Sequence, residues 1–389
     1  MKRIPAPGLP ARPLGPLSRR GALLALASAV SSPVVAACAP SGARPSPTAP
    51  KTSPAPARRR RLPRTRAIAT RPESLETQRS PFPITSVGLK WRGPRTGLRI
   101  RFLDGAGTPS EWIPVEAGCP CGRDSSSGVR GAEISTAVVR ADDARGYQLA
   151  YPGGIDLLGA VVIDTVHGPE RLVASPAPKP SAGSSGGAPP TLDDLGLVSR
   201  AEWGADEAKA TAVPVFSPVQ ALTVHHTVTA DDDPDPAATV RAIFELHAVQ
   251  NGWGDIGYHF LVDASGRVYE GRASGADGQP AHNAAGEGVT AFHTAGFNTG
   301  NIGIALLGNM MERPPSPAAQ RSTARLLAAL ARKHGLDPLS EITYVNPATG
   351  ATRKTSPVNG HGTWTSTECP GTETGIAGLR KAASEELAV

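Results

Sequence analysis

The stretch that decides the fold is Val219-Gln-Ala-Leu-Thr-Val-His225-His226, an apolar run that ends in two imidazoles. Its length and its bounding turn residues predict a buried β-strand, so the histidines sit at a strand end, where a fold can hold side chains rigidly. Near the C-terminus the chain reads His361-Gly-Thr-Trp-Thr-Ser-Thr367-Glu-Cys369-Pro-Gly371, which adds an imidazole and a thiol. Two imidazoles and one thiolate suit a catalytic zinc, which keeps three protein ligands and leaves its fourth position to water.

The net charge of the 389 residues is +6, but this charge is unevenly placed. Residues 1–72 hold fourteen Lys and Arg and no Asp or Glu, whereas residues 73–389 carry a net charge of −8. The folded part is therefore acidic, and we expect no nucleic-acid partner. The length predicts two domains with linkers.

Residues 1–38 predict an export signal. The pair Arg19-Arg20 precedes a short apolar run, which is typical of the twin-arginine route. Val35-Ala-Ala-Cys38 resembles a bacterial lipobox, in which Cys38 is lipidated; an ordinary secretory peptide that contains a Cys is the alternative. A membrane span is disfavoured because the apolar core is short. We expect a protein of the cell envelope, anchored through Cys38 to the outer face of the cytoplasmic membrane or secreted to the cell wall.

Composition divides the middle of the chain. Residues 39–80 are rich in Pro and Arg and predict a disordered tether. Residues 81–169 show short strand patterns between Gly- and Pro-rich turns, and predict a small all-β, sandwich-like accessory domain. We interpret it as a binding or spacer module. Its Cys119-Pro-Cys121 could form a small strained disulfide or stay reduced, and a metal site is disfavoured because zinc knuckles space their thiols further apart. Residues 170–191 predict a linker.

Residues 192–389 predict an α/β domain, because helical and strand patterns alternate along them. Asp235-Pro236 and Ser316-Pro317 each predict a helix start, with an N-cap residue followed by proline. Gly335 predicts the end of the second of these helices, and a last helix is expected over about 373–387. We expect His247 to be a packed core imidazole.

An ordered set of motifs in this domain resembles that of the peptidoglycan recognition proteins, a family that includes zinc N-acetylmuramoyl-L-alanine amidases. The resemblance covers about residues 197–385 and implies a mixed central β-sheet flanked by helices. The matching motifs are Ser199-Arg-Ala-Glu-Trp-Gly204, His225-His-Thr227, Gly252–Phe260, Val268–Arg272, His293–Ile304 and Thr367–Gly371.

The resemblance also implies the site residues. One zinc ion is expected on His225, His361 and Cys369, and family members that have lost catalysis commonly lack the Cys. Tyr258 and Thr367 match residues that line the zinc water in active members. The expected substrate is peptidoglycan, bound by a monomer, and the residues expected to bind it are His226, Trp253, His293 and Asn298.

The chain departs from the family pattern at two places. It has His361-Gly-Thr363 where the family often has His-Arg-Asp. The loop between Gly271 and Phe292 is longer and contains His282, which we expect to be exposed, although it could approach the cleft.

Two hypotheses follow. The first is a zinc amidase that hydrolyses the amide bond between N-acetylmuramic acid and L-alanine of peptidoglycan by zinc-activated water. The alternative is a non-catalytic peptidoglycan-binding protein with a structural zinc. Three protein ligands favour the enzyme, because structural zinc sites are usually closed by four. No general base is assigned: Glu368 neighbours two site residues but points the opposite way in an extended segment.

Overall fold

A mixed five-stranded sheet is built around the apolar stretch identified in the sequence. In the computed structural model of the chain, β10 (Ala221–His226) is buried along its whole length. It runs parallel to β14 (Asn301–Leu306) on one side and to β17 (Val358–Gly360) on the other. Next to β14, β11 (Phe260–Val262) is parallel, and β12 (Val268–Glu270) is antiparallel to β11. The strand order β12-β11-β14-β10-β17 confirms the α/β prediction.

The structure describes residues 58–118, 121–124, 134–175, 188–275 and 279–388. All of them belong to one compact unit, Ala55–Val389. The predicted export signal, with Cys38 and its lipid anchor, lies outside the described residues. Within the described ranges no helix is long and apolar enough to cross a membrane.

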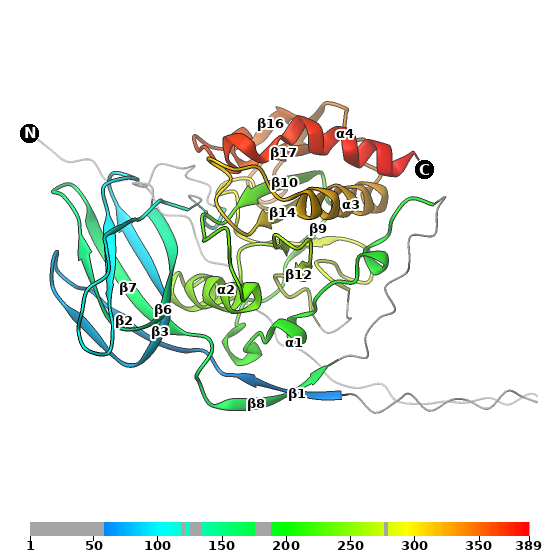
Figure 1. Cartoon of the computed structure of the whole chain (residues 1–389). Helices are drawn as coiled ribbons and strands as arrows, with labels where there is room; N and C mark the ends of the chain where they lie inside the picture. Colours follow the sequence, from blue (N-terminus) through cyan, green and yellow to red (C-terminus); the bar gives the residue numbers. More distant parts are fainter. Residues whose placement is uncertain (1–57, 119–120, 125–133, 176–187, 276–278, 389) are drawn as a thin grey trace, which may run out of the picture. The chain divides into compact units, whose positions relative to one another are not determined.

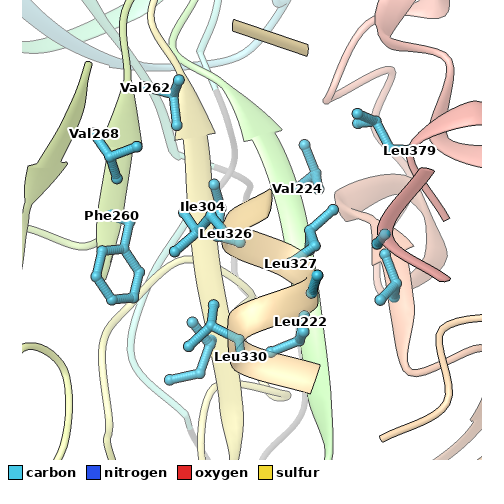
Figure 2. Packing of buried hydrophobic residues seen from close by; sticks show 14 of the residues in the cluster. Leu222, Val224, Phe260, Val262, Val268, Ile304, Leu326, Leu327, Leu330 and Leu379 are labelled. Atoms are coloured by element: carbon cyan, nitrogen blue, oxygen red, sulfur yellow. The ribbon is translucent and has the colours of Figure 1, made fainter. Parts of the chain in front are cut away.

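Two long helices cover one face of this sheet. α3 (Pro317–His334) starts as predicted, with Ser316 Oγ accepting the Ala319 N–H at 3.0 Å, and ends at Gly335 in the left-handed conformation. α4 (Ile376–Leu387) lies beside α3 (Figure 1). The core between α3 and the sheet is mostly aliphatic, with the ring of Phe260 among its members (Figure 2), and its central side chains are Leu222, Val224, Ile304, Leu326, Leu327 and Leu330.

The opposite face of the sheet packs against α2 (Pro236–Phe244). Asp235 caps this helix by accepting the Ala238 N–H at 3.0 Å, as the sequence predicted. The helix continues into a π-helical turn, η3 (Glu245–Gln250). His247 on this turn is buried, and its Nδ1 accepts the Gly257 N–H at 3.1 Å. This confirms that His247 is a core residue.

Short elements complete the domain. They are α1 (Arg200–Trp203), β9 (Phe216–Ser217), β13 (Gly288–Val289), β15 (Ile342–Val345), β16 (Thr352–Thr355), and the 3-10 turns η1 (Leu192–Leu195), η2 (Glu207–Lys209), η4 (His361–Thr363) and η5 (Thr372–Thr374).

The N-terminal part is all-β, as predicted, but its strands form one six-stranded sheet in the order β2-β7-β3-β6-β4-β5. Antiparallel β3 and β6 are its longest strands, and their pairing is interrupted by register shifts between Arg79 and Ser86. Such irregularities bend a sheet. The six strands are β2 (Arg66–Thr70), β3 (Gln78–Arg92), β4 (Arg99–Leu103), β5 (Ile113–Pro114), β6 (Ile134–Ala150) and β7 (Asp156–Asp164). Two further strands, β1 (Arg58–Pro63) and β8 (Glu170–Ser175), form a separate two-stranded sheet.

The predicted boundaries of this part are wrong at both ends. β1, β2 and the start of β3 fall within 39–80, the range predicted as a disordered tether. β8 falls within 170–191, the range predicted as a linker, and pairs antiparallel with β1. Composition fails here because each strand depends on a partner about a hundred residues away, and strand formation follows such packing more than local propensity.

The all-β part shares a core with the α/β domain. Val161 and Ile163 of β7 belong to one apolar cluster with Ile243 and Leu246. The buried Arg241 guanidinium donates to the carbonyl oxygens of Thr165 at 3.1 Å and Trp203 at 2.8 Å. The module is therefore packed firmly against α2.

The prediction that His282 is an exposed loop residue is wrong. His282 is buried, and its ring stacks on that of His334 at the end of α3, with ring centroids 5.0 Å apart. Their Nε2 atoms lie 2.9 Å apart. The loop folds back on α3, which sequence spacing alone does not reveal.

This histidine pair predicts an acid-sensitive fold. Burial, as the largest cause, lowers the pKa of His282 to about 4 and that of His334 to about 4. An unfolded histidine has a pKa of about 6.5. Between these values the unfolded chain binds protons that the folded chain does not, so the free energy of unfolding falls as the pH drops from about 6.5 towards 4.

We expect His334→Gln to make this decline shallower, as measured by urea unfolding at a series of pH values. His167→Gln, in the all-β part, is the matched control. An unchanged pH dependence in His334→Gln would contradict the assignment.

Candidate metal centre

The first two predicted ligands are brought together by parallel strand pairing. Val224 of β10 pairs with Gly360 of β17, so the next residues, His225 and His361, emerge side by side at the same edge of the sheet. Both side chains are fully buried, and their ring centroids lie 4.6 Å apart. Ligand sites in parallel sheets form at such carboxyl ends of strands.

The third predicted ligand lies against the first. The buried Cys369 Sγ is 3.6 Å from His225 Nδ1. The loop that carries it is tied back, because Gly362 N–H donates to the Cys369 carbonyl at 2.8 Å. A Cβ at position 362 would stand 2.9 Å from the Thr367 carbonyl oxygen. A larger residue at this position would therefore require the Thr367 backbone to shift.

A chain of hydrogen bonds sets the tautomer of His225. His293 Nε2 lies 2.9 Å from the Asn301 carbonyl, which can only accept, so this nitrogen carries the proton. Burial, and next the neighbouring His225, hold the pKa of His293 well below its ordinary value, so the ring is neutral. His293 Nδ1 therefore accepts from His225 Nε2 at 3.0 Å. The lone pair of His225 is left on Nδ1, which faces the Cys369 sulphur.

This hydrogen-bond relay, from the Asn301 carbonyl through His293 to His225, requires a glycine at position 303. A Cβ at Gly303 of β14 would come within 2.5 Å of the His293 ring. Any larger residue there would push His293 away from His225.

The donor set fits a zinc ion. Both ring nitrogens of the buried His361 lack a hydrogen-bond partner among the described residues, and buried polar atoms without partners are costly unless they bind a ligand. Zinc–sulphur and zinc–nitrogen bonds in a tetrahedron place the two donor atoms about 3.5 Å apart. The separation of Cys369 Sγ and His225 Nδ1 agrees with this value.

The two predicted catalytic residues lie at the same site. The Tyr258 ring centroid is 5.4 Å from that of His225. Thr367 Oγ1 accepts the Cys369 N–H at 3.3 Å. Thr367 and Cys369 line a cavity of about 380 Å³, and the acidic side chains that line it are Glu116, Glu312 and Glu368.

Two of the residues predicted to bind substrate, His226 and Trp253, make contacts within the protein. His226 lines the cavity, and its Nδ1 accepts the Met310 N–H at 3.1 Å. Trp253 is buried against the rings of His247 and Phe292. Their contact with substrate stays a prediction.

The other two residues predicted to bind substrate, His293 and Asn298, are fully buried. His293 is fully buried behind His225, where it orients that ligand. Asn298 Oδ1 accepts the backbone N–H groups of His293 and Thr294, each at 2.8 Å. Substrate contact stays a prediction for both.

One site residue was missed in the sequence. Cys121 of the all-β part places its sulphur beside His225 and His361, and the three donor atoms lie within 4.8 Å of one another. The sequence disfavoured a metal site at Cys119-Pro-Cys121, whereas the structure places the Cys121 thiol among donors that could hold a metal ion. The spacing of two neighbouring cysteines decides only whether both can bind one metal in a zinc knuckle. That criterion does not apply to Cys121, because the other donors come from strand ends far along the chain.

Comparison with known proteins shows the family to which the chain belongs. Residues 215–372 match the family model described as N-acetylmuramoyl-L-alanine amidase. Peptidoglycan recognition protein 1 of Bos taurus is 35% identical over 149 residues, which span 38% of this chain and 71% of that protein. The chain belongs to the peptidoglycan recognition protein and N-acetylmuramoyl-L-alanine amidase family.

Other members of this family match over different shares of their length. The human N-acetylmuramoyl-L-alanine amidase is 33% identical over 141 residues, or 35% of this chain and 22% of that protein. The match thus spans about a fifth of that relative. Among solved structures, Drosophila peptidoglycan recognition protein SD is 24% identical, with a TM-score of 0.36, over 48% of this chain and 93% of that one.

The role of His293 is testable without measuring catalysis. We expect His293→Ala to weaken zinc binding by about 10- to 100-fold, because the group that orients a ligating histidine is lost. Competition against a chromophoric chelator would measure the change. His167→Ala should leave the affinity unchanged. Equal affinity of His293→Ala and the unmodified chain would rule out the relay.

Proposed function

We propose that this family member is a zinc-dependent amidase that hydrolyses the bond between N-acetylmuramic acid and L-alanine in peptidoglycan. One observation carries the proposal: the buried rings of His225 and His361 lie side by side, the Cys369 sulphur lies 3.6 Å from His225 Nδ1, and both ring nitrogens of His361 lack a hydrogen-bond partner among the described residues. Relatives named as N-acetylmuramoyl-L-alanine amidases support it.

The proposed chemistry divides between the metal and the chain. A bound zinc would polarise the amide carbonyl and lower the pKa of its water from 15.7 to about 7. Tyr258 and Thr367 would donate hydrogen bonds to the oxyanion that develops at the carbonyl. His293 keeps His225 in the tautomer that presents Nδ1. The carboxylates of Glu116, Glu312 and Glu368 are the acidic groups of the adjoining cavity that are available to accept a proton.

A second function has one observation in its favour. Cys121 would bring the number of protein donors to four, as in a closed structural zinc site. On this alternative the chain binds peptidoglycan without cleaving it.

Two substitutions separate metal binding from catalysis. Cys369→Ser replaces a thiolate with a neutral hydroxyl, so we expect zinc affinity to fall sharply and hydrolysis to be lost. Tyr258→Phe should retain zinc but lower turnover by about 100- to 1000-fold, because one oxyanion donor is removed. Zinc content and the release of stem peptides, followed by mass spectrometry, measure the two effects.

The matched control for the second change is Tyr151→Phe, which removes a hydroxyl of the all-β part that donates to the Pro72 carbonyl. Peptidoglycan cleavage by Cys369→Ser at the unmodified rate would refute the zinc mechanism.

We also propose an envelope location through lipidation of Cys38, motivated by Val35-Ala-Ala-Cys38. Metabolic labelling with a clickable fatty acid should mark the chain, and Cys38→Ala should abolish the mark. Absence of label on a chain released to the medium would exclude the anchor.

A further inference from the structure

We infer that Cys121 is a fourth, displaceable ligand of the metal, and that the segment 121–124 thereby keeps the amidase in a closed, latent state. The latent state rests on the proposed function, whereas the role of Cys121 as a ligand does not. Two independent observations support the inference: the position of the thiol, and the way in which the segment is fastened.

The position of Cys121 is that of a ligand. Its sulphur forms a cluster of donor atoms with His225 and His361, all within 4.8 Å. The thiol also lies 3.3 Å from the His293 carbonyl. A thiolate in this place would supply a further sulphur donor to a zinc held by His225 and His361, and it would occupy a position that a catalytic site keeps for water.

The segment is held in place by a cage of hydrogen-bond donors that surrounds the carboxylate of Asp124. Asp124 Oδ1 accepts from Asn298 N–H at 3.0 Å and from Asn298 Nδ2 at 2.7 Å. Asp124 Oδ2 accepts from Thr299 N–H at 3.2 Å, Thr299 Oγ1 at 3.0 Å and Asn346 Nδ2 at 2.9 Å. Such a concentration of donors is a carboxylate-binding site.

The residues between the thiol and the carboxylate add further contacts. The Gly122 carbonyl accepts from Asn298 Nδ2 at 2.8 Å. The Arg123 guanidinium lies 4.8 Å from the centre of the Phe292 ring and donates to the Gly252 carbonyl at 3.1 Å. All four residues of the segment thus contact the α/β domain.

These contacts are of a kind that substrate can replace. The segment belongs to no helix or strand, and Cys121 is only partly buried, whereas His225, His361 and Cys369 are buried. The cage on Asn298, Thr299 and Asn346 would equally accept a carboxylate of the peptide in a muropeptide. Substrate and segment therefore compete for the same donors, and release of Asp124 would free the metal position held by Cys121.

The test counts sulphur ligands on the full-length chain loaded with zinc. X-ray absorption at the zinc edge should give two sulphur and two nitrogen ligands, and Cys121→Ser should give one sulphur. Asp142→Asn, in the all-β part, is the control and should keep two. One sulphur in the unmodified chain, unchanged in Cys121→Ser, would overturn the inference.

The same variants test latency through turnover of a soluble muropeptide. We expect Cys121→Ser to raise turnover about tenfold or more, because a site that is closed nine-tenths of the time loses that fraction of its activity. Asp124→Asn, which puts an amide among donors, should act in the same direction, with Asp142→Asn as its control.

The outcomes separate the two proposals. Loss of one sulphur without a gain in turnover, in a chain that does cleave, would overturn latency. If no variant cleaves, the proposed amidase function fails, while the sulphur count still decides whether Cys121 is a ligand.

Discussion

The parallel register between β10 and β17 is the constraint on which the rest of the site depends. A slip of one residue would send His225 or His361 to the wrong face of the sheet. The register is locked by a buried polar network centred on Thr223 Oγ1, which lies 2.8 Å from Asn301 Oδ1 and 2.9 Å from Asn359 Oδ1. Trp364 Nε1 donates to the same hydroxyl at 2.7 Å. This network aligns β10, β14 and β17, and its residues Thr223 and Asn359 lie two positions before the proposed ligands His225 and His361.

The environment of the site is built to keep imidazoles neutral. His259 shows this beside His293: burial, as the largest cause, lowers its pKa to about 3. Its Nδ1 accepts the Gly303 N–H at 2.8 Å while its Nε2 lies 2.6 Å from the Val289 carbonyl. A neutral ring with one fixed proton is what a metal ligand, or the group behind it, requires. In the same apolar surroundings, the buried ring nitrogens of His361 have no hydrogen-bond partner among the described residues, which is costly unless they bind a metal.

The sequence predicted those parts of the fold that depend on local patterns. The β10 run, the caps Asp235 and Ser316 and the terminator Gly335 could all be recognised, because each acts within a few residues. The predicted ligands were recognised with the help of a family resemblance. The sequence did not predict the contacts between distant segments, which are those of β1 with β8, of His282 with His334, and of Cys121 with the strand ends. No spacing in the chain encodes these contacts, since each joins residues that are far apart in sequence and meet only in the folded protein.

Gly303 carries a consequence for how members of this family are sorted into enzymes and receptors. Presence of the ligating cysteine is a natural criterion, because it can be read from an alignment. Yet a single methyl group at Gly303 would displace His293 and release His225 from its tautomer, with every ligand still in place. A family member could then retain the cysteine and still lack amidase activity. The identity of the residue opposite Thr223 on β14 is therefore as informative about activity as the ligands themselves.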